Sequence, residues 1–347
     1  MSTLAEHTLY KPSELRERWA PIEPTVVFDT YWRFAAERQR IFFKRARGES
    51  PPWTNDPILR TYRFTNAYRA SDRVSQFLIR HVIYSGDYSL EDTVFRILLF
   101  KLFNKIDTWQ LLCSGLGELS LGTFSVDAYG KVLSAAMDRG ITIYSAAYIM
   151  PSGGSRLGYR RKHQNHLALL DQMMVDGLPG KLQRCSHMSE AFDLLKSYPS
   201  IGDFLAYQFA TDINYSEVTD FSEMEFVVPG PGARSGIRKC FSSLGGLTEE
   251  EVIYHMAHRQ AEEFSRLRLS FERIGARPLQ LIDCQNLFCE TDKYARLAHP
   301  TIKGVGARTR IKQRFRANPQ STPQMYPPKW GIDEQVHDRL ARPGEAT

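Results

Sequence analysis

A row of large polar side chains near the N-terminal end has the residue types that bind phosphate. The row lies in PPWTNDPILRTYRFTNAYRASDRVSQFLIRHVIY (51–84) and contains Asn66, Arg69, Asp72, Arg73, Gln76 and Arg80. Helical spacing would place Arg69 and Arg73 one turn apart and facing one point, with the two amides a turn to either side. Such donors bind phosphate oxygens, and Asp72 would orient one arginine. The alternative is a salt-bridged, solvent-exposed helix face, which is the more common role of such a row.

The turn YPSIG (198–202) is a second candidate phosphate-binding element, because it joins two helical patterns. Ser200, Ile201 and Gly202 come directly before the second helix and offer its free backbone N–H groups at the N-terminus. Such groups bind a phosphate of a nucleic-acid backbone. An ordinary corner between two helices is the alternative interpretation.

Two further segments place cations beside glycine or acidic residues. In VVPGPGARSGIRK (227–239), a Gly-Pro-Gly sequence precedes Arg234, Arg238 and Lys239. It predicts a loop that approaches a ligand closely and contacts phosphate, with an ordinary basic turn as the alternative. In DCQNLFCETDKYAR (283–296), Lys293 could bind a phosphate or carboxylate, or only pair with Glu290 on a helix surface.

The composition favours a soluble protein with a polyanionic partner. The chain has 347 residues, 42% of them hydrophobic, and a net charge of +6, so it can bury a sizeable core. Its cations concentrate in three glycine-containing segments, 156–166, 233–239 and 303–316, which favours nucleic acid. No apolar run reaches the length of a membrane span, and the N-terminus lacks a signal-peptide layout. We therefore expect a soluble, cytoplasmic protein.

The cysteines and other metal-binding residues form no recognisable site. The five cysteines are widely spaced and include no CxxC pair, so neither a disulfide framework nor a zinc site is predicted. Reduced thiols are the simple interpretation. No cofactor is expected, and a metal ion is neither required nor excluded.

Periodicity predicts a mostly α protein. A helix over 26–47 ends at Gly48 and the two following prolines, and the quoted segment supplies the next. Further helices are expected at 90–105, 126–139, 162–175, 188–197, 203–213, 248–274 and 286–296. The run ITIYSAAYIM (141–150) could be strand or helix. We expect an N-terminal extension over 1–25, a single helical domain over 26–316 that could form two lobes, and a Pro-rich tail over 317–347 that is flexible or draped over the surface.

Three segments together resemble one family. They are residues 51–79, 200–239 and 283–296. In their order they are similar to the α-glutamyl/putrescinyl-thymine pyrophosphorylase-like proteins of phages, also described as amino acid:DNA transferases and related to the helical domain of 5-hydroxymethyluracil DNA kinases. The turn at 198–202 resembles the helix-hairpin-helix element of DNA-glycosylase-type folds, with Ser200 in place of the first glycine. Phe204 stands where lyase-type enzymes carry lysine, so a Schiff-base route is unsupported.

The resemblance implies a DNA-glycosylase-like helical fold that modifies a base already in DNA. The expected substrate is DNA with phosphorylated 5-hydroxymethyluracil, a 5-(pyro)phosphomethyl-deoxyuridine. The amine of an amino acid or polyamine would displace the phosphate or pyrophosphate. A phage-encoded protein of this kind would act in the cytoplasm of the infected cell.

The resemblance also suggests roles for individual residues. The amine must lose a proton, and Asp212 is the first candidate to accept it or hold the amine, with Glu225 the second. Gln208 lies four residues before Asp212 and could read the edge of an extruded pyrimidine. Capping or ion pairing is the alternative for both aspartate and glutamate. Cys289 could add to the uracil ring, or be a small buried side chain.

Other functions remain open from the sequence. A DNA-base kinase would need Gly-x-x-x-x-Gly-Lys-Ser/Thr, and GLPGKLQ (177–183) has the wrong spacing and no hydroxyl. A glycosylase would use the same fold with a single acidic residue. A non-catalytic helix-hairpin-helix DNA-binding protein would use its arginines for affinity alone.

Overall fold

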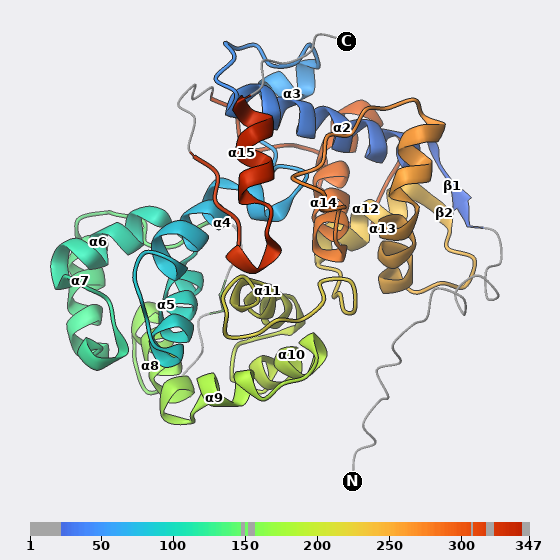
Figure 1. The fold of residues 1–347 in the computed structure, drawn as a ribbon. Coiled ribbons are helices and arrows are strands. Elements are labelled where there is room, and N and C mark those ends of the chain that lie inside the picture. Colours follow the sequence, from blue (N-terminus) through green and yellow to red (C-terminus); the bar gives the residue numbers. More distant parts are fainter. Residues whose placement is uncertain (1–21, 147–149, 152–156, 307, 317–322, 342–347) are drawn as a thin grey trace. The chain divides into compact units, whose positions relative to one another are not determined.

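The computed structural model describes residues 22–146, 150–151, 157–306, 308–316 and 323–341 (Figure 1). Within these ranges the chain is mostly helical, and its two short strands form one sheet. The prediction of a mostly α protein is confirmed. The chain divides into two compact units: unit 1 comprises Met1–Asp72 and Glu223–Thr347, and unit 2 comprises Arg73–Ser222.

The core of unit 1 is built on two long helices, α2 (Val26–Ala46) and α14 (Leu281–Ala298). Thr25 begins α2, since its side-chain oxygen accepts a hydrogen bond from a first-turn N–H at 3.1 Å. Tyr31 of α2 is fully buried, and its ring centroid lies 4.7 Å from that of Phe288 of α14. Aromatic contacts of this kind fix the two helices against each other.

Two more helices, α12 (Pro231–Cys240) and α13 (Glu249–Arg266), complete this core. Gly236 allows α12 to lie directly on the backbone of α14. A Cβ atom at position 236 would be 2.1 Å from the carbonyl oxygen of Phe288, so no larger residue fits without moving a helix. The start of α13 is fixed by a capping box in which Thr248 is the N-cap.

Short elements surround the core of unit 1. Strand β1 (Glu23–Pro24) pairs antiparallel with β2 (Phe241–Ser243), with Glu23 opposite Ser243. The remaining elements of unit 1 are α3 (Pro57–Thr61), η1 (Arg69–Ser71), η5 (Pro328–Trp330) and α15 (Asp333–Ala341).

The described part of the Pro-rich tail, residues 323–341, lies on unit 1. Tyr326 is fully buried, and its hydroxyl is 2.7 Å from the hydroxyl of Ser71. The guanidinium of Arg277 lies 3.8 Å from the ring centroid of Trp330. These contacts hold the segment beside η1. The N-terminal extension falls almost entirely outside the described residues, as do 317–322 and 342–347.

All regular secondary structure in the described part of unit 2 is helical, and loops join the helices. Its elements are α4 (Arg73–Phe77), the π-helix η2 (Leu78–Ile83), α5 (Leu90–Phe103), α6 (Ile106–Leu116), η3 (Leu121–Thr123), α7 (Val126–Asp138), α8 (Lys162–Val175), α9 (Leu178–Gln183), α10 (Met188–Lys196) and α11 (Asp203–Ile213). Helix α5 is apolar and buried, and it contains Arg96. This guanidinium donates to the carbonyl oxygens of Val82 and Leu119 at 2.9 and 2.8 Å, which satisfies a buried charge.

Six predicted helices agree with the structure to within a few residues. They are α2, α5, α7, α8, α10 and α11. Helix α14 also extends the one predicted at 286–296, while α13 ends at Arg266 rather than at residue 274. The described part of 141–150 is neither helix nor strand. Helix α12 replaces the predicted Gly-Pro-Gly loop, because Pro231 and the glycines begin a helix that packs on α14.

The single helix predicted after Pro52 is wrong. Asp56 caps α3, which ends at Thr61, and Tyr62 is extended. The chain then passes through η1, and Asp72 is again extended with ψ of 146° before α4 begins. Phe64 and Tyr68 have a helical spacing in the sequence, but both are buried in unit 1 in a segment that is not helical. Tertiary contacts therefore override the local helical pattern here.

Candidate functional site

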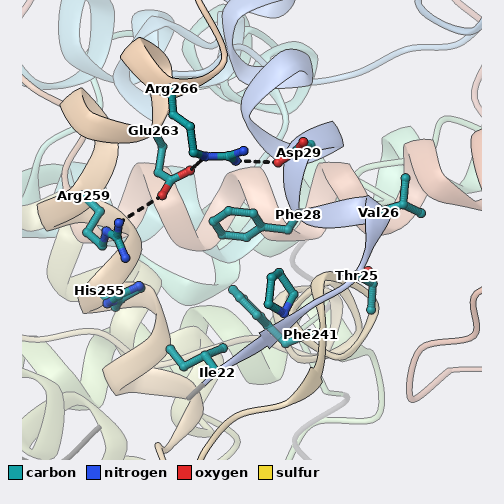
Figure 2. Close-up of a pocket in the computed structure, with 11 residues that line it drawn as sticks. Ile22, Thr25, Val26, Phe28, Asp29, Phe241, His255, Arg259, Glu263 and Arg266 are labelled. Carbon is teal, nitrogen blue, oxygen red and sulfur yellow. Dashed lines mark hydrogen bonds and ion pairs between the residues drawn. The ribbon is translucent and has the colours of Figure 1, made fainter. Parts of the chain in front are cut away.

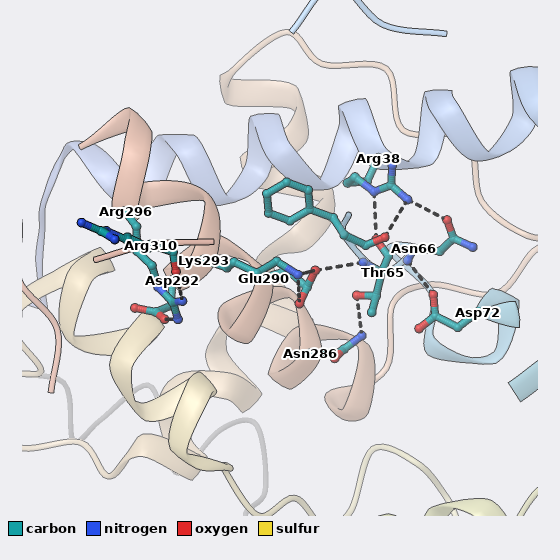
Figure 3. Close-up of polar contacts among 11 residues, drawn as sticks. Arg38, Thr65, Asn66, Asp72, Asn286, Glu290, Asp292, Lys293, Arg296 and Arg310 are labelled. Carbon is teal, nitrogen blue, oxygen red and sulfur yellow. Dashed lines mark hydrogen bonds and ion pairs between the residues drawn. The ribbon is translucent and has the colours of Figure 1, made fainter. Parts of the chain in front are cut away.

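The loop 64–72 is held along one face of α14. Asp283, Asn286, Glu290 and Lys293 lie at positions i, i+3, i+7 and i+10 of that helix, a spacing that places them on one side. Each of them contacts the loop or supports a residue that does. Figure 3 shows Asn286, Glu290 and Lys293 at this place. The sequence motif 283–296 and the quoted segment 51–79 therefore meet in space.

The centre of this contact is Thr65. Its backbone N–H donates to Glu290 Oε2 at 2.9 Å, and its hydroxyl accepts from Asn286 Nδ2 at 3.2 Å. Lys293 Nζ is 2.7 Å from the same Glu290 oxygen and 4.5 Å from the ring centroid of Phe64. The ion pair between Lys293 and Glu290 is thus present, and it also holds the loop.

Helix α2 contributes Arg38 from the other side of the loop. Its Nε donates to the carbonyl oxygen of Thr65 at 2.8 Å, and Nη2 donates to Asn66 Oδ1 at 3.0 Å. Arg38 is buried, so its charge is used inside the protein to fix carbonyl and amide groups. Nothing in the helical pattern of 26–47 distinguishes this arginine from the exposed ones, such as Arg33.

Asp72 closes the loop on itself. Its Oδ1 accepts from the N–H of Asn66 at 2.7 Å, and the Asn66 amide donates to the carbonyl oxygen of Ser71 at 2.8 Å. Asp72 keeps part of its surface exposed. Removal from bulk water raises the pKa of this carboxyl to about 7, against the opposing effect of the Asn66 N–H. The group can therefore exchange a proton near neutral pH.

A second carboxyl, Asp283, supports the loop from beneath. It accepts from the N–H of Arg69 at 2.8 Å and from that of Gln280 at 2.9 Å. Burial raises its pKa to about 7, although both N–H groups lower it. Asp283 is 4% exposed, so it orients the backbone rather than meeting a substrate.

Burial separates the cluster into supporting and accessible groups. Arg38, Asp283 and Glu290 are buried and fix the loop. The part-exposed members are Thr65, Asn66, Asp72, Asn286 and Lys293. A carboxyl that titrates near neutral pH, an ammonium and two amides are together suited to move a proton and to bind an anion.

The structure places the predicted phosphate-binding row differently from the sequence interpretation. Asn66 and Asp72 face each other across the loop, but Arg69 is buried in η1 and the helix is interrupted at Asp72. Arg69 and Arg73 therefore do not have the i, i+4 helical geometry. Arg73 is exposed and Gln76 buried, both on α4 of unit 2.

The two candidates on α11 are inside unit 2. Asp212 is fully buried, and its Oδ2 lies 2.9 Å from Lys101 Nζ, which also donates to Asn104. Gln208 is 1% exposed. A residue that accepts a proton from a substrate must be reachable, so the catalytic roles predicted for Asp212 and Gln208 do not fit this environment. The ion-pairing alternative describes Asp212.

The turn between α10 and α11 has an open N-terminal side. Ser200 has a left-handed φ of 66°, the conformation that glycine adopts without strain. Gly202 is the N-cap of α11 without a side-chain cap, and an added Cβ would meet no atom within 4 Å. Ile201 points inward and is 4% exposed. The first backbone N–H groups of α11 thus lack side-chain bulk around them.

The cations of α12 are engaged by acidic residues. Arg234 and Arg238 lie 3.4 and 3.5 Å from the carboxylate of Glu249 while remaining half exposed. Lys239 is buried and lies 3.0 Å from Asp292 Oδ1. Lys239 is therefore a core ion pair, which corrects its predicted role in DNA binding.

Two remaining candidates receive different environments. Glu225 is part-exposed in unit 1, and the neighbouring Glu223 is the buried acid, 2.9 Å from Arg277. Burial raises the pKa of the Cys289 thiol to about 12. A nucleophilic cysteine needs a lowered pKa, so the structural alternative holds for Cys289.

A separate cavity of about 600 Å³ lies between the start of α2, β2 and α13 (Figure 2). Phe28 and Phe241 form apolar walls, with ring centroids 5.3 Å apart. Arg266 lies between Asp29 and Glu263, within 2.8 Å of each. Burial lowers the pKa of His255 to about 4. At neutral pH the cavity therefore offers apolar walls and arginine already paired with carboxylates.

The described residues contain neither a metal-binding cluster nor a membrane-spanning helix. No group of three or more histidine, cysteine, aspartate or glutamate side chains in these ranges could hold a metal ion. No helix in the same ranges has the length and apolar character needed to cross a membrane.

Comparison with known proteins identifies the family. The profile of the helical domain of 5-hmdU DNA kinase matches residues 25–304. The chain belongs to this family. The 5-hmdU DNA kinase of Bacillus phage SP10 is 27% identical over 301 residues, covering 81% of this chain and 46% of the phage protein. The chain thus spans about half the length of that relative, and no solved structure gives a significant match.

The family membership confirms the relation that three sequence motifs indicated. The motifs located the cluster, yet Arg38, Asp283 and Asn286 were missed as members. The residues of α14 could have been found from the sequence. Asp283, Asn286, Glu290 and Lys293 have the spacing of polar residues on one face of a helix.

Proposed function

We propose that this protein is an amino acid:DNA transferase that acts on phosphorylated 5-hydroxymethyluracil in DNA. The amine nitrogen of an amino acid or polyamine forms a bond to the methylene carbon attached to the base. The bond from that carbon to the phosphate or pyrophosphate oxygen breaks, and the leaving group departs with the electron pair. A carboxylate accepts the proton that the nitrogen loses.

The observation that carries this proposal is the part-exposed carboxyl of Asp72, with a pKa of about 7, in a family tied to 5-hydroxymethyluracil DNA. A general base works best when its pKa is near the working pH. Asp72 is bound to Asn66, and Glu290 with Lys293 is bound to the adjacent Thr65. Asp72 therefore replaces Asp212 as the proposed base, and Glu225 is retained as its comparison.

Lys293 and its neighbours are proposed to bind the leaving phosphate. The ammonium has three donors, and its side chain keeps 19% of its surface exposed beside Glu290. The amide of Asn286 lies one turn away on the same helix face. Positive charge and N–H donors at this place stabilise the negative charge that develops as the carbon–oxygen bond breaks. Arg73 is exposed on unit 2 and remains a proposed substrate contact. Gln76 and Arg69 are buried, so Gln76 is not kept as a contact and Arg69 is proposed to support the loop.

We further propose that α10, the turn and α11 form a helix-hairpin-helix element of a DNA-glycosylase-like fold. The left-handed conformation of Ser200 supports this, because the motif has glycine at that position. The uncapped N-terminus of α11 supports a phosphate contact at Ser200, Ile201 and Gly202. Arg234 and Arg238 are half exposed and would add contacts from unit 1.

The test is mass spectrometry of the nucleosides released from phosphorylated 5-hydroxymethyluracil DNA after incubation with protein and a pool of amino acids or polyamines. The expected result is a nucleoside whose mass equals that of the phosphorylated substrate nucleoside plus the amine, minus phosphoric or pyrophosphoric acid. Unmodified nucleosides in every reaction would overturn the transferase proposal.

The same experiment separates the second candidate, a base-excision glycosylase, which the turn at 198–202 favours. A glycosylase releases free modified base and leaves an abasic site. Phe204 occupies the position of the lyase lysine, so strand cleavage through a Schiff base is not expected. A non-catalytic DNA-binding protein would give neither product, and its arginines would affect DNA affinity alone.

A further inference from the structure

The segment 308–316 carries a cation at every second residue. Its sequence, RTRIKQRFR, places positive charges at Arg308, Arg310, Lys312, Arg314 and Arg316. Side chains two residues apart on an extended chain point to the same side. The family profile ends at residue 304, so this segment lies outside the part of the chain that the family accounts for.

The intervening residues attach the segment to unit 1. Ile311 is buried, and Phe315 is half buried with its ring centroid 6.4 Å from that of Trp53. The backbone pairs with the residues after α3: Arg63 N–H donates to the carbonyl oxygen of Gln313 at 3.0 Å, and Phe315 N–H donates to that of Thr61 at 2.9 Å. The backbone is therefore paired with unit 1 around residues 313–315, and Ile311 and Phe315 anchor the segment, while Thr309 and Gln313 are exposed.

A further attachment comes from α14. Arg296 Nη1 donates to the carbonyl oxygen of Arg310 at 3.2 Å (Figure 3). This bond uses the backbone of Arg310 and leaves its side chain at the surface, where it is exposed. Arg296 itself is paired with Asp292 of α14. The cationic segment is thus tied to the same helix that holds the candidate site.

The outward cations lack acidic partners in the described part of the chain. All five are exposed, and none forms an ion pair with another described residue; Arg314 lies over the ring of Tyr62 at 5.2 Å. Some other exposed arginines of unit 1 differ. Arg234 and Arg266, for example, are each paired with a glutamate or aspartate. The positive charge of 308–316 is therefore uncompensated, and an anionic partner would supply the missing charge.

The spacing of the charges suits a regular polyanion. Alternate residues of an extended chain are about 6.6–6.8 Å apart, and one DNA strand carries a phosphate about every 3.4 Å along the helix axis. Both the cations and the phosphates therefore recur at regular intervals of a few ångströms, so several cations can lie near phosphates of one strand. Arginine and lysine at such a surface bind phosphates without reading sequence.

We propose that residues 308–316 form a phosphate-binding strip that follows the sugar-phosphate backbone of DNA. The proposal rests on the proposed function in that it takes DNA as the macromolecular substrate. The strip supplies affinity independent of sequence, while the loop 64–72 and α14 carry the chemistry. It adds binding residues to the candidates on α11 and α12.

The test is the salt dependence of binding to unmodified duplex DNA, measured by fluorescence anisotropy. The variant combines Arg308→Gln, Arg310→Gln and Lys312→Gln. Each lost phosphate contact lowers the slope of log Kd against log salt concentration by about 0.9, so we expect a decrease of about 2.7. Arg310→Lys keeps the charge and should keep the slope.

A matched control removes the same charge elsewhere. Lys131→Gln, Arg139→Gln and Lys181→Gln together delete three exposed cations of unit 2, and this variant should keep the slope. Equal slopes for the strip variant and the native protein would overturn the proposal. So would a strip variant that keeps DNA binding but loses binding to polyglutamate, because the partner would then be an acidic polypeptide.

The readout also separates this proposal from the proposed function. Binding to unmodified DNA requires no transfer chemistry, so the slope is informative even if no amine is transferred. If transfer occurs, a modified oligonucleotide too short to reach the strip should react equally well with the native and strip variants. A longer duplex should react more slowly with the strip variant at moderate salt.

Discussion

Asp72 and Asp212 are two aspartates to which the sequence analysis gave different roles, one orienting an arginine and one accepting a proton, and the structure gives them opposite environments. Asp72 lies in a loop of unit 1, part-exposed, with a backbone N–H as its partner. Asp212 lies inside unit 2 with the ammonium of Lys101 at 2.9 Å. The difference teaches that the partner and the exposure of a carboxyl decide its role.

The physical reason is the energy of removing charge from water. Loss of hydration is costly for a carboxylate, so the pKa rises for the buried Asp283 and for the part-exposed Asp72, although neighbouring N–H groups and arginines oppose this rise. A buried carboxylate beside an ammonium keeps its charge, but the pair is then committed to the interior. Asp72 can thus exchange protons, whereas Asp212 holds α11 to α5.

The largest expected effect is on catalysis by Asp72. Asp72→Asn is nearly isosteric and keeps the carbonyl oxygen that accepts from Asn66. Amine transfer should fall roughly 10²–10⁴-fold, the usual range for loss of a general base. Quantification of modified nucleoside by mass spectrometry checks this. Glu225→Gln is the matched control and should transfer normally; the opposite pattern would move the base to Glu225.

The pH dependence of the transfer rate tests the same role of Asp72. A base must be unprotonated, so the native rate should rise with pH and show an inflection near the Asp72 pKa of about 7. Asp72→Asn should lack this inflection and retain only the rise caused by deprotonation of the free amine. The difference between the two proteins should therefore shrink at high pH.

The contribution of Asp72 to the free energy of unfolding should fall as the pH rises, whereas the rate of transfer should increase. The folded pKa of Asp72 is raised from the ordinary 3.8 to about 7, so the folded state binds its proton more tightly than the unfolded state does. This contribution to the free energy of unfolding is complete below the ordinary value and is lost as the pH rises through about 7. Urea titrations should show that Asp72→Asn has a weaker pH dependence over this range.

The next largest effect concerns the buried pair of unit 2. Lys101→Met leaves the Asp212 carboxylate inside without its cation and should lower the free energy of unfolding by about 3–5 kcal/mol. Denaturant unfolding measures this. The double variant Lys101→Met with Asp212→Leu removes both charges and should recover much of the loss. Transfer activity per folded molecule should be unchanged, and a loss of activity in a stable double variant would restore Asp212 to the site.

The sequence predicted most helices because their patterns are local. The apolar spacing and flanking breakers of α2, α7, α8 and α11 follow from contacts within a few turns. The segment after Pro52 was predicted as one helix because its polar and apolar residues also fit a helical period. Its actual course depends on partners more than 200 residues away, such as Asp283 for Arg69 and Gln313 for Arg63, which local patterns do not contain.

Part of the candidate cluster could be predicted from the sequence, because some of its members have residue types that suggest chemistry. Asn66, Asp72 and Lys293 were recognised by residue type, and the structure brings all three to the loop. Arg38 was missed because it belongs to an ordinary amphipathic helix and becomes special only when it reaches Thr65. Lys239 was misassigned because its burial beside Asp292 depends on the close contact of α12 with α14.

Two glycines sharpen the contrast between packing and binding. Gly236 faces the backbone of α14, where a Cβ would lie 2.1 Å from an oxygen, whereas Gly202 faces open space. Gly236→Ala should therefore lower the free energy of unfolding by about 1–3 kcal/mol, the usual effect of overpacking. Gly202→Ala should change it by much less. Thermal or denaturant unfolding of the two variants, side by side, makes the comparison, and equal losses would contradict it.

The smallest effect is expected at the turn before α11, and it tests whether that turn meets DNA. The N-terminus of α11 has partial positive charge and N–H groups without a side-chain cap. Gly202→Glu would place a carboxylate where a phosphate is proposed to bind, while the open space around Gly202 leaves the fold intact. The interaction of one charge with a helix N-terminus contributes about 0.3–1 kcal/mol. Loss of this contribution should lower DNA affinity about two- to fivefold at low salt. Gly202→Gln has the same bulk without the charge and should bind nearly as the native protein does. If Gly202→Glu and Gly202→Gln bind DNA equally to the native protein, the turn is an ordinary corner, and the contacts to DNA must come from other residues.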